Sequence, residues 1–110
     1  MRRVLIIDDD RLSGVPPGTV LAKSSTEAIN RFKERSAWDD VYFDHDLGGS
    51  DTSMRVVEWL EQRLNEEHPI FIERAYVHSM NPAGAEALMR ALRRMYPTRR
   101  IPLPWERSAR

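Results

Sequence analysis

The sequence has no cysteine, only two lysines, no long apolar run and no net charge. The lack of cysteine excludes a disulfide framework, a thiolate zinc site and a cysteine nucleophile. No apolar run approaches the roughly 20 residues that a membrane span needs, so we expect no membrane association. Because the net charge is zero, the protein as a whole has no electrostatic field that would attract nucleic acid, and we expect no specific binding of duplex DNA. The Met-Arg-Arg start leads directly into a strand-like run rather than a signal-peptide core, which favours a cytoplasmic location.

Short apolar runs alternate with amphipathic stretches along the 110 residues. Strands are predicted at residues 4–7, 19–22, 41–43 and 71–77, and the continuous apolar runs among them are typical of strands buried on both faces. Helices are predicted over residues 25–35 and 52–67, and a third helix is opened by Asn81-Pro82. Prolines and glycines exclude a regular helix over residues 11–18. This order predicts one α/β domain spanning residues 1–110, with a doubly wound parallel sheet of four to five strands. The connection after the first strand, over residues 11–18, is predicted to be a loop instead of a first helix, and residues 99–110 form an edge strand or a tail.

Acidic residues follow the first and third predicted strands. Asp8, Asp9 and Asp10 come directly after one apolar run, and Asp44 and Asp46 come after the other. Because ligands bind outside the carboxyl ends of parallel strands, these side chains mark a candidate site. Neighbouring strand ends lie roughly 5 Å apart, so their carboxylates would repel one another unless a cation joined them. We expect Mg²⁺, or another divalent cation such as Mn²⁺, with Asp8, Asp9 and Asp44 as ligands. The alternative is that these residues cap nearby backbone amides in turns.

Two histidines end predicted strands beside these acids. His45 follows Asp44, and His78 follows the strand at 71–77. A neutral imidazole can act as general acid or general base near pH 7, so His45 and His78 are a candidate acid–base pair. A buried histidine bonded to a backbone carbonyl is the structural alternative for each. Ser79 and Asn81 precede a helix whose N-terminus can bind an anion, and either residue could also simply cap that helix.

The sequence has no Walker-type loop, no His-Glu-x-x-His and no Gly-x-Ser-x-Gly motif. A strand-borne pair of aromatic residues, as on nucleic-acid-binding sheets, is not evident. Arginines are concentrated from Arg90 to Arg110, and these either bind a phosphate backbone or only solubilise the last helix and tail.

Several motifs resemble the receiver domains of two-component signalling. "VLIIDD" at 4–9 resembles their first strand and acidic pair, and "VYFDHDLGG" at 41–49 resembles their third strand, with Asp44 at the phospho-acceptor position. One departure is that receivers carry a lysine at the end of the fifth strand, whereas the lysines here are Lys23 and Lys33. "FDHDLGG" with "VHSMNPAGAEALM" is more similar to a narrower receiver-like family, frequent in phage and bacteria and named for cyclic-phosphate processing.

The resemblance implies hydrolysis of a cyclic phosphate on an RNA end or a nucleotide by a metal-dependent phosphoesterase. In this interpretation Asp8, Asp9, Asp44 and Asp46 hold the metal. Asp44, His45 and His78 are catalytic, and Ser79 and Asn81 bind the phosphate. The alternative is a non-catalytic receiver-like signalling or docking module, which accounts for the acids but not for the histidines.

Overall fold

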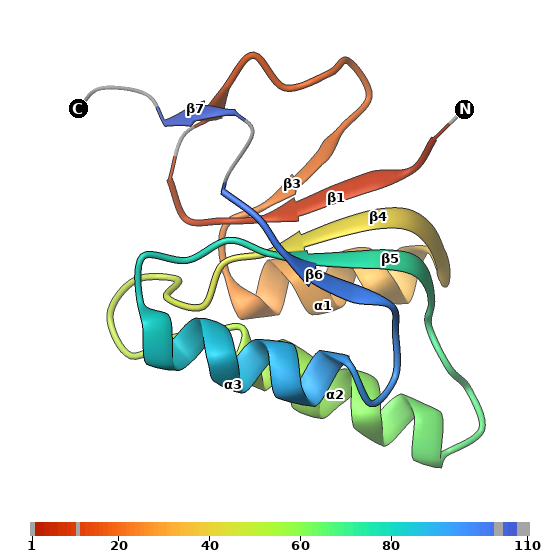
Figure 1. Ribbon diagram of the computed structural model, residues 1–110. Helices are drawn as coiled ribbons and strands as arrows, with labels where there is room; N and C mark the ends of the chain where they lie inside the picture. Colours follow the sequence, from red (N-terminus) through yellow and green to blue (C-terminus); the bar gives the residue numbers. More distant parts are fainter. Residues whose placement is uncertain (1, 11, 103–104, 108–110) are drawn as a thin grey trace.

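Five parallel strands form the central sheet of the protein in its computed structural model (Figure 1). The structure describes residues 2–10, 12–102 and 105–107. In spatial order the strands are β3 (Val20–Ala22), β1 (Val4–Ile7), β4 (Ala37–Phe43), β5 (Phe71–Val77) and β6 (Thr98–Arg100). The helices are α1 (Ser25–Glu34), α2 (Met54–Asn65) and α3 (Pro82–Leu92), and two short strands, β2 (Leu12–Ser13) and β7 (Glu106–Arg107), pair antiparallel. The prediction of an α/β fold with a parallel sheet is confirmed.

The strand order is doubly wound, but helices cover only one face of the sheet. The chain moves from β1 outward to β3, then returns past β1 to β4, β5 and β6. The three returning crossovers carry α1, α2 and α3, all on the same side of the sheet in Figure 1. The outgoing crossover has no helix in its described residues and contains β2 instead. The prolines and glycines at residues 14–18 explain why no helix forms there.

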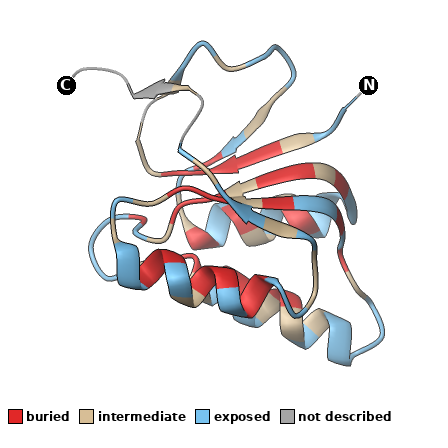
Figure 2. Cartoon of the chain, in the orientation of Figure 1, coloured by how far each residue is buried: buried red, intermediate tan, exposed pale blue. Residues whose placement is uncertain are grey.

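The core lies between the sheet and the three helices (Figure 2). Leu5 and Ile7 of β1 and Val41 and Phe43 of β4 are fully buried against this helical layer. Phe32 of α1 packs between two tryptophans, stacked on Trp59 and edge-on to Trp38. Burial of such side chains supplies most of the stabilising free energy of a domain this size, at about 2 kcal/mol for each large apolar side chain.

The helix-free face carries an aromatic cluster that was not predicted. Tyr42 of β4 and Tyr76 of β5 stack with ring centroids 4.6 Å apart, and Trp105 lies edge-on to Tyr42 at 4.7 Å. The tyrosines are far apart in the sequence and meet only because the parallel register pairs them. Burial, followed by the nearby Asp40 charge, raises the pKa of Tyr42 above its ordinary value.

Element boundaries differ most from the predictions in β4 and β6. β4 begins at Ala37, earlier than its apolar run, because the buried Asp40 is held in the strand by a 2.6 Å ion pair with Arg2. Of the edge strand or tail predicted over 99–110, the strand that joins the sheet is short, since β6 runs from Thr98 to Arg100. Of the predicted tail, residues 103–104 and 108–110 lie outside the described residues. No helix in the described part of the chain is long and apolar enough to cross a membrane.

Candidate functional site

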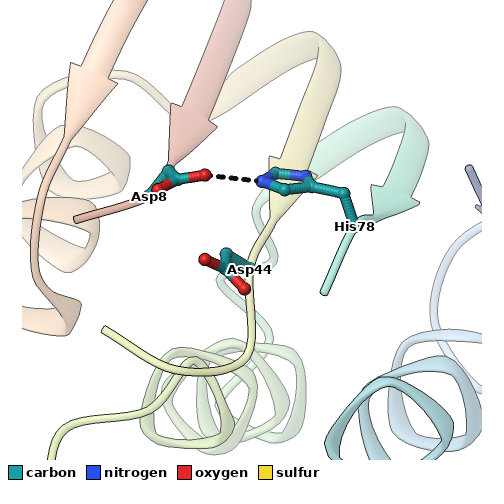
Figure 3. Close-up of side chains that lie close together, drawn as sticks. All are labelled: Asp8, Asp44 and His78. Carbon is teal, nitrogen blue, oxygen red and sulfur yellow. Dashed lines mark hydrogen bonds and ion pairs between the residues drawn. The ribbon is translucent and has the colours of Figure 1, made fainter. Parts of the chain in front are cut away.

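Asp8, Asp44 and His78 lie side by side at the carboxyl end of the sheet (Figure 3). Each follows the last residue of its strand, and the register that aligns Ile7, Phe43 and Val77 also aligns them. Their side chains are at least nine-tenths buried, and one ligand atom from each lies within 4.8 Å of the others. Three residues predicted to form a site therefore meet in one buried cluster, called here the acidic cluster.

The acidic cluster occupies the topological switch point of the sheet. β1 and β4 are the neighbouring strands from which the chain departs in opposite directions, first to β3 and later to β5. Ligands in open parallel sheets bind outside the strand ends at this point. Asp8 and Asp44 come from these two strands, so they lie where a ligand is expected.

His78 is held by a hydrogen bond within the cluster. Its Nε2 donates to Oδ2 of Asp8 at 3.0 Å, and both side chains are almost fully buried. Oδ1 of Asp8 accepts from the backbone N–H of Asp10 at 2.8 Å. The predicted alternative of a turn-capping aspartate thus also occurs, since Asp8 caps the turn and orients the imidazole at once.

A shallow hollow opens beside the acidic cluster. It has a volume of about 580 Å³, and its lining residues are Asp9, Asp10, Asp44, Asp46, Gly48, Gly49 and Met80. Gly48 has φ of +91°, and a Cβ at this position would lie 3.3 Å from Oδ2 of Asp9. A glycine here therefore both allows the turn and leaves space for the Asp9 carboxylate.

His45 lies at the N-terminus of α3 and is not part of the acidic cluster. Its Nδ1 donates to Oδ1 of Asp46 at 2.8 Å, and its side chain is only 15% exposed. The ring packs so closely on Gly84 of α3 that a Cβ there would lie 2.5 Å from the imidazole Cγ. The carboxylate of Asp46 is 61% exposed and also faces the Asn81 amide at 3.5 Å.

Ser79 and Asn81 shape the turn into α3. Asn81 caps the helix by accepting from the N–H of Gly84 at 3.0 Å, and Ser79 Oγ accepts from the N–H of Asn81 at 3.1 Å. The capping alternative is therefore present for Asn81. The Ser79 hydroxyl hydrogen and the Asn81 amide hydrogen that is not directed at Asp46 remain as donors at this helix N-terminus.

The loop between β4 and α2 is fixed by side-chain hydrogen bonds. Asp51 accepts from both the N–H and the hydroxyl of Ser25, at 2.8 and 2.6 Å. Burial alone would raise the pKa of Asp51, but the two hydrogen bonds from Ser25 and the charge of Arg55 outweigh it and lower the pKa. The Ser53 hydroxyl donates to the backbone carbonyl of Asp44. These contacts join α1 and α2 to the loop that carries Asp44, His45 and Asp46.

The acidic cluster has a donor set that fits a divalent cation. Oxygen–metal bonds of about 2.1 Å place neighbouring ligand atoms roughly 3 to 4 Å apart, and the cluster's atoms lie within 4.8 Å of one another. Carboxylate oxygens suit Mg²⁺ or Mn²⁺, and the imidazole suits Mn²⁺ better than Mg²⁺. Asp8, Asp9 and Asp10 form a second, more exposed group of the same kind. Burying two carboxylates is unfavourable without a compensating positive charge, which a cation would provide.

Gly84 is the residue whose role sequence reasoning missed. In the sequence, Gly84 stands out only as part of the motif "VHSMNPAGAEALM" at 77–89, and no contact was assigned to it. The available signal was a glycine in the first turn of a helix, where glycine is unfavourable unless close packing requires it.

Comparison with known families agrees with this arrangement. Residues 3–94 match the model of the cyclic-phosphate processing receiver domain, a stretch that runs from β1 to just beyond the end of α3. None of the curated proteins matches the sequence. The matched stretch contains every residue of the acidic cluster as well as His45 and Gly84, and it covers most of the chain. The protein is therefore a member of the cyclic-phosphate processing receiver domain family.

Proposed function

We propose that this protein is a metal-dependent phosphoesterase that opens a cyclic phosphate on a nucleotide or an RNA end. The observation that carries the proposal is the buried group of Asp8, Asp44 and His78 at the switch point, in a chain of this family. Opening the ring is a hydrolysis. Water forms a new P–O bond, the bond to one ribose oxygen breaks, and the product is a phosphomonoester.

Asp8 and Asp44, assisted by Asp9, would hold the cation, with a contribution from Asp46, which lines the same hollow. A bound Mg²⁺ or Mn²⁺ would polarise a phosphoryl oxygen and lower the pKa of water. Because both cluster carboxylates are buried, their charges are weakly screened and attract a cation strongly.

His78 is the proposed general acid. Asp8 accepts its Nε2–H and so fixes the proton on the nitrogen that faces the cluster. In the reaction the doubly protonated ring would give the proton on Nδ1, a buried nitrogen with no hydrogen-bond partner among the described residues, to the departing ribose oxygen, while Nε2–H stays bonded to Asp8 and keeps the ring oriented.

His45 is the proposed general base. Its Nδ1–H donates to Asp46, which leaves Nε2 with a lone pair that can accept a proton from the attacking water. Gly84 fixes the plane of this ring. Ser79 and the Asn81 amide would donate to the remaining phosphoryl oxygens, beside the positive end of the α3 dipole.

The test is hydrolysis of a panel of substrates: 2′,3′-cyclic nucleotides, 3′,5′-cyclic nucleotides and an RNA ending in a 2′,3′-cyclic phosphate. Each is assayed with Mg²⁺, with Mn²⁺ and with a chelator. We expect metal-dependent turnover that His78→Ala and His45→Ala each reduce by about 10²-fold or more. Full turnover in either variant would contradict the acid–base assignment, and no turnover of any substrate would contradict the proposed activity.

A further inference from the structure

Four arginines line a groove at the open edge of the sheet. Arg90, Arg93 and Arg94 come from α3 and the turn that follows it, and Arg100 comes from the edge strand β6. With Glu86 and Met89 they enclose a volume of about 650 Å³. This set is called here the arginine groove.

The positive charges of the arginine groove outnumber its negative charges. All four arginine side chains are exposed, and none makes a hydrogen bond or ion pair with another of the described residues. Glu86 is the acidic residue of the lining, so three positive charges remain in excess on a chain with no net charge. Like charges around one groove repel one another, and a polyanion would remove that repulsion.

The arginine groove and the acidic cluster are linked through β5, β6 and α3. Arg100 is the register partner of Val77, the residue directly before His78. α3 starts at the rim of the site, where Asn81 faces Asp46, and it carries Arg90 near its far end. A helix rises 1.5 Å per residue, so Pro82 and Arg90 are separated by about 12 Å along α3. Phosphates of one strand follow one another at about 3.4 Å along the axis of a stacked helix and lie further apart in an extended strand, so that length accommodates at least two of them.

We infer that the substrate is the end of a single-stranded RNA, whose preceding phosphates bind in the arginine groove while the cyclic phosphate reaches the acidic cluster. This inference rests on the proposed function. A cyclic nucleotide has no second phosphate that could reach Arg90 or Arg93. A terminal cyclic phosphate on a polynucleotide needs a 2′-hydroxyl, so the polymer is RNA and not DNA. Guanidinium groups suit this task because they bind phosphate oxygens in pairs.

Binding is measured first, without turnover. The probe is a short fluorescein-labelled single-stranded RNA with a 2′,3′-cyclic phosphate end, titrated by fluorescence anisotropy in chelator over a range of salt concentrations. The groove variant combines Arg90→Gln, Arg93→Gln and Arg94→Gln. Its matched control combines Arg3→Gln, Lys33→Gln and Arg35→Gln, which removes the same charge from exposed positions at the start of β1 and the end of α1.

We expect the groove variant to bind RNA at least about tenfold more weakly, and its salt slope to fall by about 2, because three phosphate contacts are lost. The control should change affinity less than about twofold. Equal losses in both variants would show that only net charge matters and would overturn the inference. Absence of RNA binding by the unmodified protein would overturn it as well.

Turnover then separates this inference from the proposed function. The groove variant should lose activity on the RNA substrate and keep full activity on a 2′,3′-cyclic nucleotide. Equal activity of the groove variant and the unmodified protein on both substrates would overturn the groove while leaving the phosphoesterase intact. Because anisotropy is read in chelator, a protein without hydrolytic activity would still report whether the groove binds RNA.

Discussion

Nε2 of His78 donates to Oδ2 of Asp8 at 3.0 Å, although the two residues are 70 positions apart. Both side chains are almost fully buried, so the bond forms only when β1, β4 and β5 have assembled in register. A buried carboxylate beside an imidazole stabilises a fold less well than apolar side chains packed in the same space. Together with Asp44, this pair makes the carboxyl edge of the sheet the candidate site (Figure 3).

Divalent cations are expected to stabilise the protein. At about 100 times its dissociation constant, a cation that binds only the folded state adds about 3 kcal/mol to the free energy of unfolding. Thermal melts with and without Mg²⁺ or Mn²⁺ should show an increase in Tm of several degrees for the unmodified protein.

The matched pair of variants for this prediction is Asp44→Asn and Asp39→Asn. Asp39 lies in β4 but bonds to the backbone of Arg3, at the opposite end of the strand from the acidic cluster. Asp39→Asn should keep the metal response and Asp44→Asn should lose it. A metal response that survives in Asp44→Asn would place the cation elsewhere.

Gly84 and His45 should be energetically coupled. In the unmodified protein a Cβ at position 84 would overlap the His45 ring, so Gly84→Ala should destabilise the fold by about 1 to 3 kcal/mol. In a His45→Ala background the overlap is gone. There the same change should stabilise by about 0.5 kcal/mol or more, because alanine favours the helix.

Urea denaturation of the four proteins of this cycle gives the coupling directly, and we expect it to be about 2 kcal/mol. Additive effects of the two substitutions would mean that Gly84 does not position His45. The pH dependence of turnover provides a second readout, since a displaced general base should alter the acidic limb of the profile in Gly84→Ala.

The fold could be predicted from the sequence because its signals are local. The apolar runs that end in Asp8 and Asp44 indicated buried parallel strands, and Asn81-Pro82 indicated the start of a helix. The prolines and glycines at 14–18 indicated that the first crossover has no helix.

The pairing of side chains could not be predicted in the same way, because it depends on register and rotamers. Both histidines end strands, yet His78 contacts Asp8 whereas His45 turns to Asp46 and Gly84. Successive residues of a strand point to opposite faces of the sheet, so whether a histidine is the first or the second residue after its strand decides which residues it contacts. The Tyr42–Tyr76 stack depends on register for the same reason.

Tyr96 should make the fold sensitive to alkali. Burial raises the pKa of Tyr96 to about 12, and its hydroxyl donates to the carbonyl of Ile70 at 2.9 Å. The folded state therefore retains a proton that the unfolded state loses above about pH 10, and stability falls as the pH rises from there towards 12. Between about pH 9 and pH 11 the loss from this residue should be about 1 kcal/mol.

Tyr96→Phe is the matched variant for this prediction, since it keeps the ring and removes the titrating group. Urea denaturation at the two pH values should show a smaller alkaline loss in the variant than in the unmodified protein. Equal losses would show that other groups cause the alkaline sensitivity.

Asp44 should not retain a phosphoryl group. It occupies the phospho-acceptor position of receivers, but the end of β6 carries no lysine, and Arg99 and Arg100 line two hollows other than the one beside the acidic cluster. Intact-mass spectrometry after incubation with acetyl phosphate and Mg²⁺ should therefore show unmodified protein. A stable adduct that is lost in Asp44→Ala would favour a receiver-like signalling or docking module.

The most direct test of the account is the rate of cyclic-phosphate opening in the unmodified protein, Asp44→Asn and Asp39→Asn, each with Mg²⁺ or Mn²⁺ and with chelator. The account predicts metal-dependent hydrolysis of a 2′,3′-cyclic phosphate that persists in Asp39→Asn and falls by at least about 10²-fold in Asp44→Asn. Hydrolysis that is independent of metal, or equal in all three proteins, would contradict the claim that the acidic cluster is the catalytic site.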